Sequence, residues 1–248
     1  MKLVVIILIA LIVAGLSFVV KNNHPIYPVN QSPIQTAPSP QPTLSPTPTP
    51  APLKLIHLTV PFTSQSPFAQ WSDPRQQDAC EEASALMAMK WVKEESIASK
   101  ESALREILAI SAYQTSNFGN FHDTSAADTV ERIFKGYYNY SNVKSINNIT
   151  VQDIITALQD GEMVITPMNG RALNNPHFTP PGPERHMIVI IGYDLDTNEF
   201  ITNDPGIAQG KDYRYPVDVF YKAIRDYPTG DHLPIVGEKK NMIVIKKS

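Results

Sequence analysis

Cys80 is the single cysteine of the 248-residue chain, and it lies where a helix is expected to begin. Asp78 is suited to cap that helix and Glu81 to complete a capping box, which places Cys80 in the first turn. Backbone N–H groups there favour an anion and can lower the pKa of a thiol. Glu81 and Glu82 oppose a thiolate, so a reactive Cys80 needs a cationic partner. The alternative is a buried cysteine acting as a small hydrophobe.

A histidine and an aspartate are expected at the ends of two neighbouring strands. His186 opens an apolar run that reaches Ile191, and Asp204 follows a second strand-like run at 199–202. If residues 194–198 join these strands as a hairpin, His186 and Asp204 meet at one edge of the sheet. An acidic group that orients an imidazole, which in turn activates a thiol, is the arrangement of nucleophilic catalysis. A structural histidine and a turn-forming Asp-Pro are the competing interpretation.

Four blocks in this order resemble the C39-like peptidases, which belong with the papain-like cysteine peptidases. They are Val60-Pro-Phe-x-x-Gln65, Cys80-Glu-x-x-Ser84, His186-Met-Ile-Val-Ile-Ile-Gly-Tyr-Asp194 and Asn203-Asp-Pro205. The resemblance covers nearly all of residues 54–248. It implies that Cys80 is the nucleophile, His186 the general base and acid, and Asp204 the partner that orients the histidine. It implies no metal and no organic cofactor.

The family also uses a glutamine before the nucleophile to hold the oxyanion. Gln65 matches the Val-Pro-x-x-x-Gln context and is the first choice for this role. The loop between Phe68 and Asp78 is long, however, so Gln76 or Gln77, which lie closer to Cys80, remain alternatives. The same loop carries Phe68 and Trp71, and we expect it to border the substrate cleft.

The first 53 residues predict a membrane anchor and a spacer. Residues 3–20 form an apolar run flanked by Lys2 and Lys21, which is just long enough to cross a bilayer. An uncleaved anchor at 1–21 is favoured over a cleaved secretory signal. Residues 22–53 contain no charged side chain and ten prolines, which is typical of an extended stalk. The rest of the chain, 54–248, is then expected outside the cytoplasm.

The elements expected in 54–248 indicate an α+β fold. Helices are expected at 80–92, 99–112, 124–137, 151–159 and 216–227, and strands at 54–60, 162–166, 186–191, 199–202 and 242–245. Helices come first and most strands later, which favours α+β over alternating α/β. The resemblance implies the papain-like form of this class, with N-terminal helices followed by an antiparallel sheet.

Net charge, cysteine count and the lack of metal-binding motifs exclude several classes of partner and cofactor. A net charge of −3 argues against nucleic acid, and a single cysteine excludes an intrachain disulfide. No His-Glu-x-x-His or Cys-x-x-Cys spacing predicts zinc. His122 and His177 lie in polar loops and are expected at the surface rather than as the base. The resemblance implies a peptide or protein substrate, and the apolar run at 3–20 predicts a membrane contact through the N-terminal segment. The sequence does not indicate an oligomeric state.

Two other functions remain open. The same three residues could act on amide or acyl groups of cell-wall material, as a thiol amidase or acyltransferase. The domain could also be a binding module that keeps the fold without turnover.

Overall fold

The computed structural model describes residues 54–247. The predicted anchor at 1–21 and stalk at 22–53 lie outside the described residues. Within 54–247, no helix combines the length and apolar character needed to cross a membrane.

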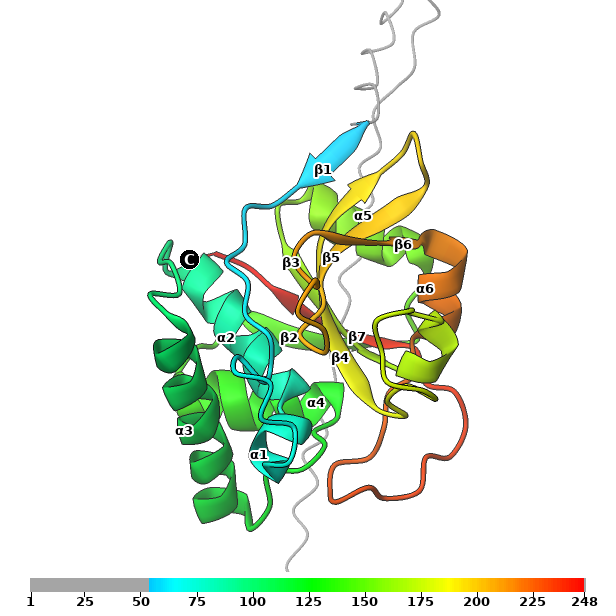
Figure 1. The fold of residues 1–248 in the computed structure, drawn as a ribbon. Helices are drawn as coiled ribbons and strands as arrows, with labels where there is room; N and C mark the ends of the chain where they lie inside the picture. Colours follow the sequence, from blue (N-terminus) through cyan, green and yellow to red (C-terminus); the bar gives the residue numbers. More distant parts are fainter. Residues whose placement is uncertain (1–53, 248) are drawn as a thin grey trace, which may run out of the picture. The chain divides into compact units, whose positions relative to one another are not determined.

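The described chain contains an antiparallel sheet and helices on both of its faces (Figure 1). The strands are β1 Leu55–His57, β2 Val143–Asn147, β3 Met163–Met168, β4 His186–Asp194, β5 Glu199–Asn203, β6 Tyr213–Pro216 and β7 Asn241–Ile245. The α-helices are α1 Pro74–Gln77, α2 Cys80–Val92, α3 Lys100–Phe118, α4 Ala126–Asp128, α5 Val151–Gln159 and α6 Val217–Ala223. A π-helix at Thr129–Tyr137 and a 3₁₀ helix at Gly170–Leu173 complete the set. The predicted α+β class with an antiparallel sheet is confirmed.

The strand order is β2-β7-β3-β4-β5-β6, and β1 pairs with the far end of β4. Strand β4 lies near the middle and is antiparallel to both β3 and β5. The β4–β5 hairpin has the predicted turn, with Asp194 opposite Glu199. Its register places Val189 opposite Asn203, so the start of β4 and the end of β5 lie at the same edge of the sheet.

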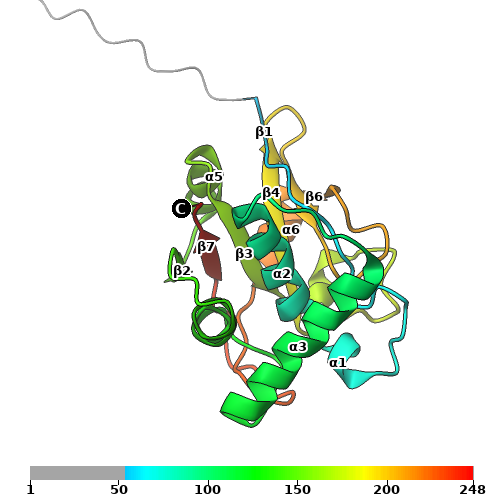
Figure 2. The ribbon, with the colours of Figure 1, turned by 90° about the vertical axis from the view of Figure 1, so that its left-hand side faces the viewer.

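Residues 187–191 of strand β4 are all apolar, and both faces of the strand are covered there. Met187, Val189 and Ile191 pack in the core cluster that includes α2. Ile188 and Ile190 pack on the opposite face in the cluster that includes α5 and α6. Figure 2 shows α2 and α3 in front of the sheet, with α5 and α6 behind it. A strand buried on both faces loses the polar alternation of a surface strand, and this fixes its first residue, His186, firmly in place.

Helix α2 begins at Cys80, as predicted, but its cap is not the predicted one. Ala79 is the N-cap residue and no side chain caps the helix. Asp78 instead ends the short helix α1, where its backbone N–H donates to Pro74 O. The capping box expected from Asp78 and Glu81 is therefore wrong, because α1 occupies the segment from which Asp78 would have reached α2.

Other boundaries differ from the prediction in ways that tertiary packing explains. The helix predicted at 124–137 is a short α4, capped by Ser125, that continues as a π-helix. Helix α3 runs on to Phe118 before Gly119 ends it with a φ of 77°. Helix α6 ends at Ala223 instead of residue 227. Strand β1 covers only 55–57 of the predicted 54–60. Strands β2 and β6 and helix α1 were not predicted.

Candidate active site

His186 and Asp204 form a buried hydrogen-bonded pair at the edge of the sheet. The Nε2 atom of His186 lies 2.7 Å from Asp204 Oδ1. Both side chains are closed to solvent, at 2% and 0% exposure. The contact follows from the hairpin, since His186 is the first residue of β4 and Asp204 the residue after β5. Because Nε2 is bonded to the carboxylate, Nδ1 is the ring nitrogen left to face a reacting group.

Further donors hold the Asp204 carboxylate in place. The hydroxyl of Tyr215 donates to Oδ2 at 2.7 Å, and Gly206 N–H donates to Oδ1 at 2.9 Å. Asn175 in turn donates to the Tyr215 oxygen at 2.6 Å. Burial, and then the charge of Asp204, raise the pKa of Tyr215 well above its usual value, so the phenol stays a neutral donor. These contacts fix the carboxylate that orients the imidazole.

The imidazole of His186 fits closely between neighbours. A Cβ at Gly206 would lie only 2.8 Å from His186 Cε1 and 3.1 Å from Nε2, so the turn after Asp204 has room only for glycine. The ring of Phe178 meets the imidazole edge to face, with 5.5 Å between centroids. The position of the ring is therefore set by packing as well as by the hydrogen bond.

Cys80 lies at the N-terminus of α2 and faces the same cavity as His186. Helix α2 is held against β4, where Ser84 Oγ donates to Met187 O at 3.3 Å. Cys80 and His186 both line a cavity of about 1590 Å³. The sheet edge and the helix start thus bring the predicted nucleophile and base together at one cleft.

The thiol of Cys80 is held by its neighbour in the sequence. Within residues 54–247, the hydrogen bond that Sγ makes is to Glu81 Oε2, at 3.0 Å, and not to His186. Burial raises the pKa of Cys80 well above its usual value, and the charge of Glu81 raises it further. The opposition of Glu81 to a thiolate was predicted. The helix N-terminus was expected to lower the pKa of the Cys80 thiol. In this arrangement burial raises that pKa instead, because desolvation is the larger effect.

The three candidate glutamines have different surroundings. The side-chain amide of Gln65 donates to Gln76 O at 3.1 Å and to Gln77 O at 2.7 Å, so both of its protons are used. The side chain of Gln76 is buried against Ser66 and Gln70. Gln77 is exposed and lines the cavity beside Cys80, as does Gln65. The role of Gln65 at the oxyanion stays a prediction.

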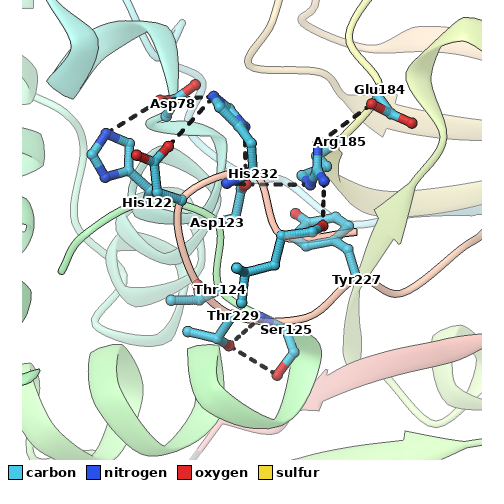
Figure 3. Close-up of polar contacts among 12 residues, drawn as sticks. Asp78, His122, Asp123, Thr124, Ser125, Glu184, Arg185, Tyr227, Thr229 and His232 are labelled. Carbon is cyan, nitrogen blue, oxygen red and sulfur yellow. Dashed lines mark hydrogen bonds and ion pairs between the residues drawn. The ribbon is translucent and has the colours of Figure 1, made fainter. Parts of the chain in front are cut away.

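Two loops form walls of the cavity. Phe68, Trp71 and Asp78 of the predicted long loop line it, so this loop borders the cleft. The second wall is the segment 229–235, here called the clasp loop. Its His232 contacts Asp123 Oδ2 at two points: the backbone N–H donates to it at 3.0 Å, and ring Nδ1 lies 3.1 Å from it. Figure 3 shows His232 between Asp78 and Asp123, with Arg185 on the far side of Asp123.

The model of the Peptidase_C39 like family matches residues 57–229, which include Cys80, His186 and Asp204. The chain belongs to this family. A crystal structure assigned as a C39-like peptidase from Bacillus anthracis is similar, with a TM-score of 0.50 and 15% identity over 79% of this chain and 100% of that one. Xylellain, a cysteine protease from Xylella fastidiosa, gives a TM-score of 0.40 and 13% identity over 80% of this chain and 87% of its own. No curated protein matches.

No hydrogen bond or ion pair joins another described histidine to Cys80, His186 or Asp204. His122 stacks on Phe121 and lies 3.8 Å from Asp78. His177 lines the cavity and meets the ring of Tyr213 edge to face. Among the described residues, no group of three or more His, Cys, Asp or Glu could hold a metal ion.

The sequence did not predict the residues that hold Asp204 and Glu81 by hydrogen bonds. Tyr215 lies on β6, which was not predicted, and the alternation of Tyr213 and Tyr215 is the signal that could have revealed that strand. Tyr227, which donates to Glu81 at 2.7 Å, was expected inside a helix and lies beyond its end. Asn175 gave no signal in its proline-rich loop.

Proposed function

We propose that this chain is a cysteine peptidase that hydrolyses peptide bonds through Cys80, His186 and Asp204. The observation that carries the proposal is the buried His186–Asp204 hydrogen bond at the cavity that Cys80 also lines. Membership of a family of cysteine peptidases supports the same chemistry.

The reaction follows from the positions of these groups. His186 Nδ1 takes the proton of the Cys80 thiol, and the thiolate attacks the substrate carbonyl carbon. The imidazolium then gives its proton to the leaving amine, which departs and leaves a thioester on Sγ. Water, deprotonated by the neutral imidazole, hydrolyses the thioester and returns the thiol. Asp204 keeps the imidazole oriented and stabilises its charged form in both halves of the cycle.

The oxyanion needs donors near Sγ. The backbone N–H of Cys80, at the start of α2, supplies one, and a glutamine side chain supplies the other. Gln65 fills this role only if its amide leaves the carbonyl groups of α1. The side chain of Gln77 lines the cavity and makes no hydrogen bond to another residue of 54–247. Gln65→Ala and Gln77→Ala separate the two, since loss of an oxyanion donor lowers kcat by about 10²–10³ with little change in KM. A fall of that size in only one variant assigns the donor.

Cell-wall amides and simple binding are the competing functions. Purified wall material and a random peptide library, offered to the same protein preparation, separate the substrate classes by the products released. New peptide termini support the peptidase, and release from walls alone supports an amidase. Binding without any product supports a module that lacks turnover.

The loop from Phe68 to Asp78 is proposed to take part in substrate selection. Its exposed aromatic side chains Phe68 and Trp71 line the cavity, where an apolar side chain of a peptide would contact them. Replacing both by serine should change the peptide-selectivity profile and leave alkylation of Cys80 unchanged. An unchanged profile would assign the loop a structural role only.

The location is a proposal that rests on the sequence alone. Residues 3–20 are apolar and residues 22–53 are rich in proline, which supports a domain held outside the cytoplasm by a membrane anchor and a stalk. Cell fractionation of the full chain should place it with membranes, open to added protease. Recovery in the culture medium would support the secreted alternative.

A further inference from the structure

Glu81 is a buried carboxylate at the active site that the proposed mechanism does not use. It is only 2% exposed, although it follows the nucleophile directly in the sequence. Its Oε1 atom accepts from Tyr227 Oη at 2.7 Å and from Thr124 N–H at 3.1 Å, and Oε2 accepts from the thiol of Cys80 at 3.0 Å. Charged side chains are rarely buried in the core of a protein. A buried glutamate that accepts three hydrogen bonds beside the nucleophile therefore points to a role at the site.

The contacts define the protonation states. Thr124 donates to Glu81 through its backbone N–H, and Tyr227 donates through a hydroxyl that lies 2.7 Å from Glu81 Oε1 and 3.3 Å from His186 O. Burial and the charge of Glu81 raise the pKa of Tyr227, so the phenol keeps its proton. Glu81 therefore presents acceptor oxygens, which is the hydrogen bonding of an ionised carboxylate. An ionised Sγ would face a second anion at 3.0 Å in a site closed to water, where like charges repel strongly. The geometry fits Cys80 as a thiol and does not fit it as a thiolate.

We infer that Glu81 is a positioning residue that keeps the resting Cys80 protonated by holding its S–H bond toward Glu81 rather than toward His186. The inference rests on the proposed function, because it concerns how the proposed nucleophile is held before reaction. The thiol becomes nucleophilic when this hydrogen bond is given up, either because substrate displaces Sγ toward His186 or because Glu81 takes up a proton. No covalent bond changes in this step.

Other ionisable groups around Glu81 decide the effect of pH. Cys80 and Tyr227 bond it directly, Glu82 follows it in α2, and Asp123 precedes Thr124, with Arg185 3.3 Å from the Asp123 carboxylate. Burial, and then the charge of Asp123, raise the pKa of Glu81 to about 7. Glu81 is thus neutral below that pH, where it no longer opposes a thiolate, and ionised above it. Mild acidification should weaken the hold on the thiol.

The test uses the pH dependence of iodoacetamide labelling, which reports Cys80 alone because the chain has no other cysteine. Glu81→Gln keeps the size of the side chain, removes the charge and can offer an N–H to Sγ. Labelling at pH 7 should become faster by on the order of tenfold, the effect of lowering the thiol pKa by about one unit. Glu82→Gln is the matched control, because Glu82 is equally buried in the same helical turn and bonds Gln114 and Ser111 instead of the thiol. Its labelling rate should equal that of the wild type.

Tyr227→Phe provides a second variant in case Glu81→Gln does not fold. It removes one donor from Glu81, so the carboxylate is more easily protonated and labelling at pH 7 should rise, by less than in Glu81→Gln. Unchanged labelling in either folded variant, or an equal rise in Glu82→Gln, would overturn the inference. Peptide cleavage is measured on the same samples. A change in labelling without any peptide cleavage supports the role of Glu81 and refutes the proposed peptidase. Peptide cleavage without a change in labelling supports the peptidase and refutes the role of Glu81.

Discussion

The orientation of His186 depends on the groups that hold the Asp204 carboxylate in place. Asp204 accepts three hydrogen bonds, from His186, Tyr215 and Gly206, and it is closed to solvent. A carboxylate held at both oxygens cannot rotate away from the imidazole. Tyr215 in turn is held by Asn175, so the chain of contacts extends from the cleft to the loop before β4.

Tyr215→Phe should therefore weaken catalysis without unfolding the domain. A hydrogen bond to a charged group contributes roughly 1.5–3 kcal/mol, and the loss of part of this from the oriented imidazole should lower kcat about tenfold or more. KM should change little, because Tyr215 does not line the cavity. Tyr213→Phe is the control, since its hydroxyl makes no hydrogen bond to another described residue. Equal kinetics in the two variants would show that Tyr215 only fills space.

The sequence predicted the proposed catalytic residues better than the residues that hold them in place by hydrogen bonds. Cys80, His186 and Asp204 could be found because each stands where an element begins or ends, and such positions leave a signal in the sequence. The partners Tyr215 and Tyr227 could not, because they reach the site through tertiary packing alone. The hydrogen bond between Cys80 and Glu81 was also hidden, since it depends on how the first turn of α2 is buried.

At the scale of elements, α2 is unusual because it buries two consecutive glutamates. Glu82 lies against α3, where Gln114 Nε2 donates to Oε1 at 2.8 Å, and its Oε2 has no hydrogen-bond partner among the described residues. Burial, and then the charge of Glu81, raise the pKa of Glu82 well above its usual 4.5. A carboxyl group whose pKa is raised by folding stabilises the fold fully below its unfolded pKa, and this stability is lost as pH rises through the folded pKa.

Glu82→Gln should consequently stabilise the domain once the pH rises above the unfolded pKa of this carboxyl group, and not below it. At pH 8 the variant has no carboxylate to bury, so its Tm should exceed that of the wild type by a few degrees. At pH 4 both side chains are neutral in the folded and the largely protonated unfolded state, and the two Tm values should agree. Thermal unfolding followed by circular dichroism at both pH values measures this. The same difference at pH 4 and pH 8 would rule out titration as the cause.

The clasp loop is held mainly by polar contacts, with Ile235 at its end packed against the core cluster that includes α2. His232 and Arg185 both contact Asp123, and Gly230 N–H donates to Asp123 O at 3.0 Å. Asp123→Ala should free the loop, and amide hydrogen exchange at 229–235 should become about tenfold faster or more. Asp231→Ala, an exposed change within the loop, should leave the exchange rates as they are. Unaltered exchange in Asp123→Ala would show that other contacts hold the loop.

The elements themselves were predictable where burial left a pattern. Strand β4 was found because both its faces are buried, and α5 because Thr150, a typical N-cap residue, precedes it. In the structure Thr150 forms a capping box with Asp153. Strands β2 and β6 were missed because they are short and partly exposed. The π-helix was read as an ordinary helix, since its pattern of apolar residues does not reveal an extra residue per turn.

At the scale of the whole domain, the cleft forms where the start of α2 meets the edge of the sheet. Neither part carries the proposed chemistry alone, because the thiol comes from the helix and the His186–Asp204 pair from the β4–β5 hairpin. The proposed mechanism therefore requires His186, from the β4–β5 hairpin, to make Cys80, from α2, nucleophilic.

A peptidyl acyloxymethyl ketone tests this claim directly, because it reacts with an activated thiolate, forms a thioether and releases a carboxylate. Intact mass should show one adduct per chain at pH 7 in the wild type, mapped to Cys80, and a rate lower by about a hundredfold or more in His186→Ala. His177→Ala, which removes another histidine of the cavity, should react like the wild type. An equal rate in wild type and His186→Ala, or no adduct on a Cys80 that iodoacetamide still alkylates, would contradict the account.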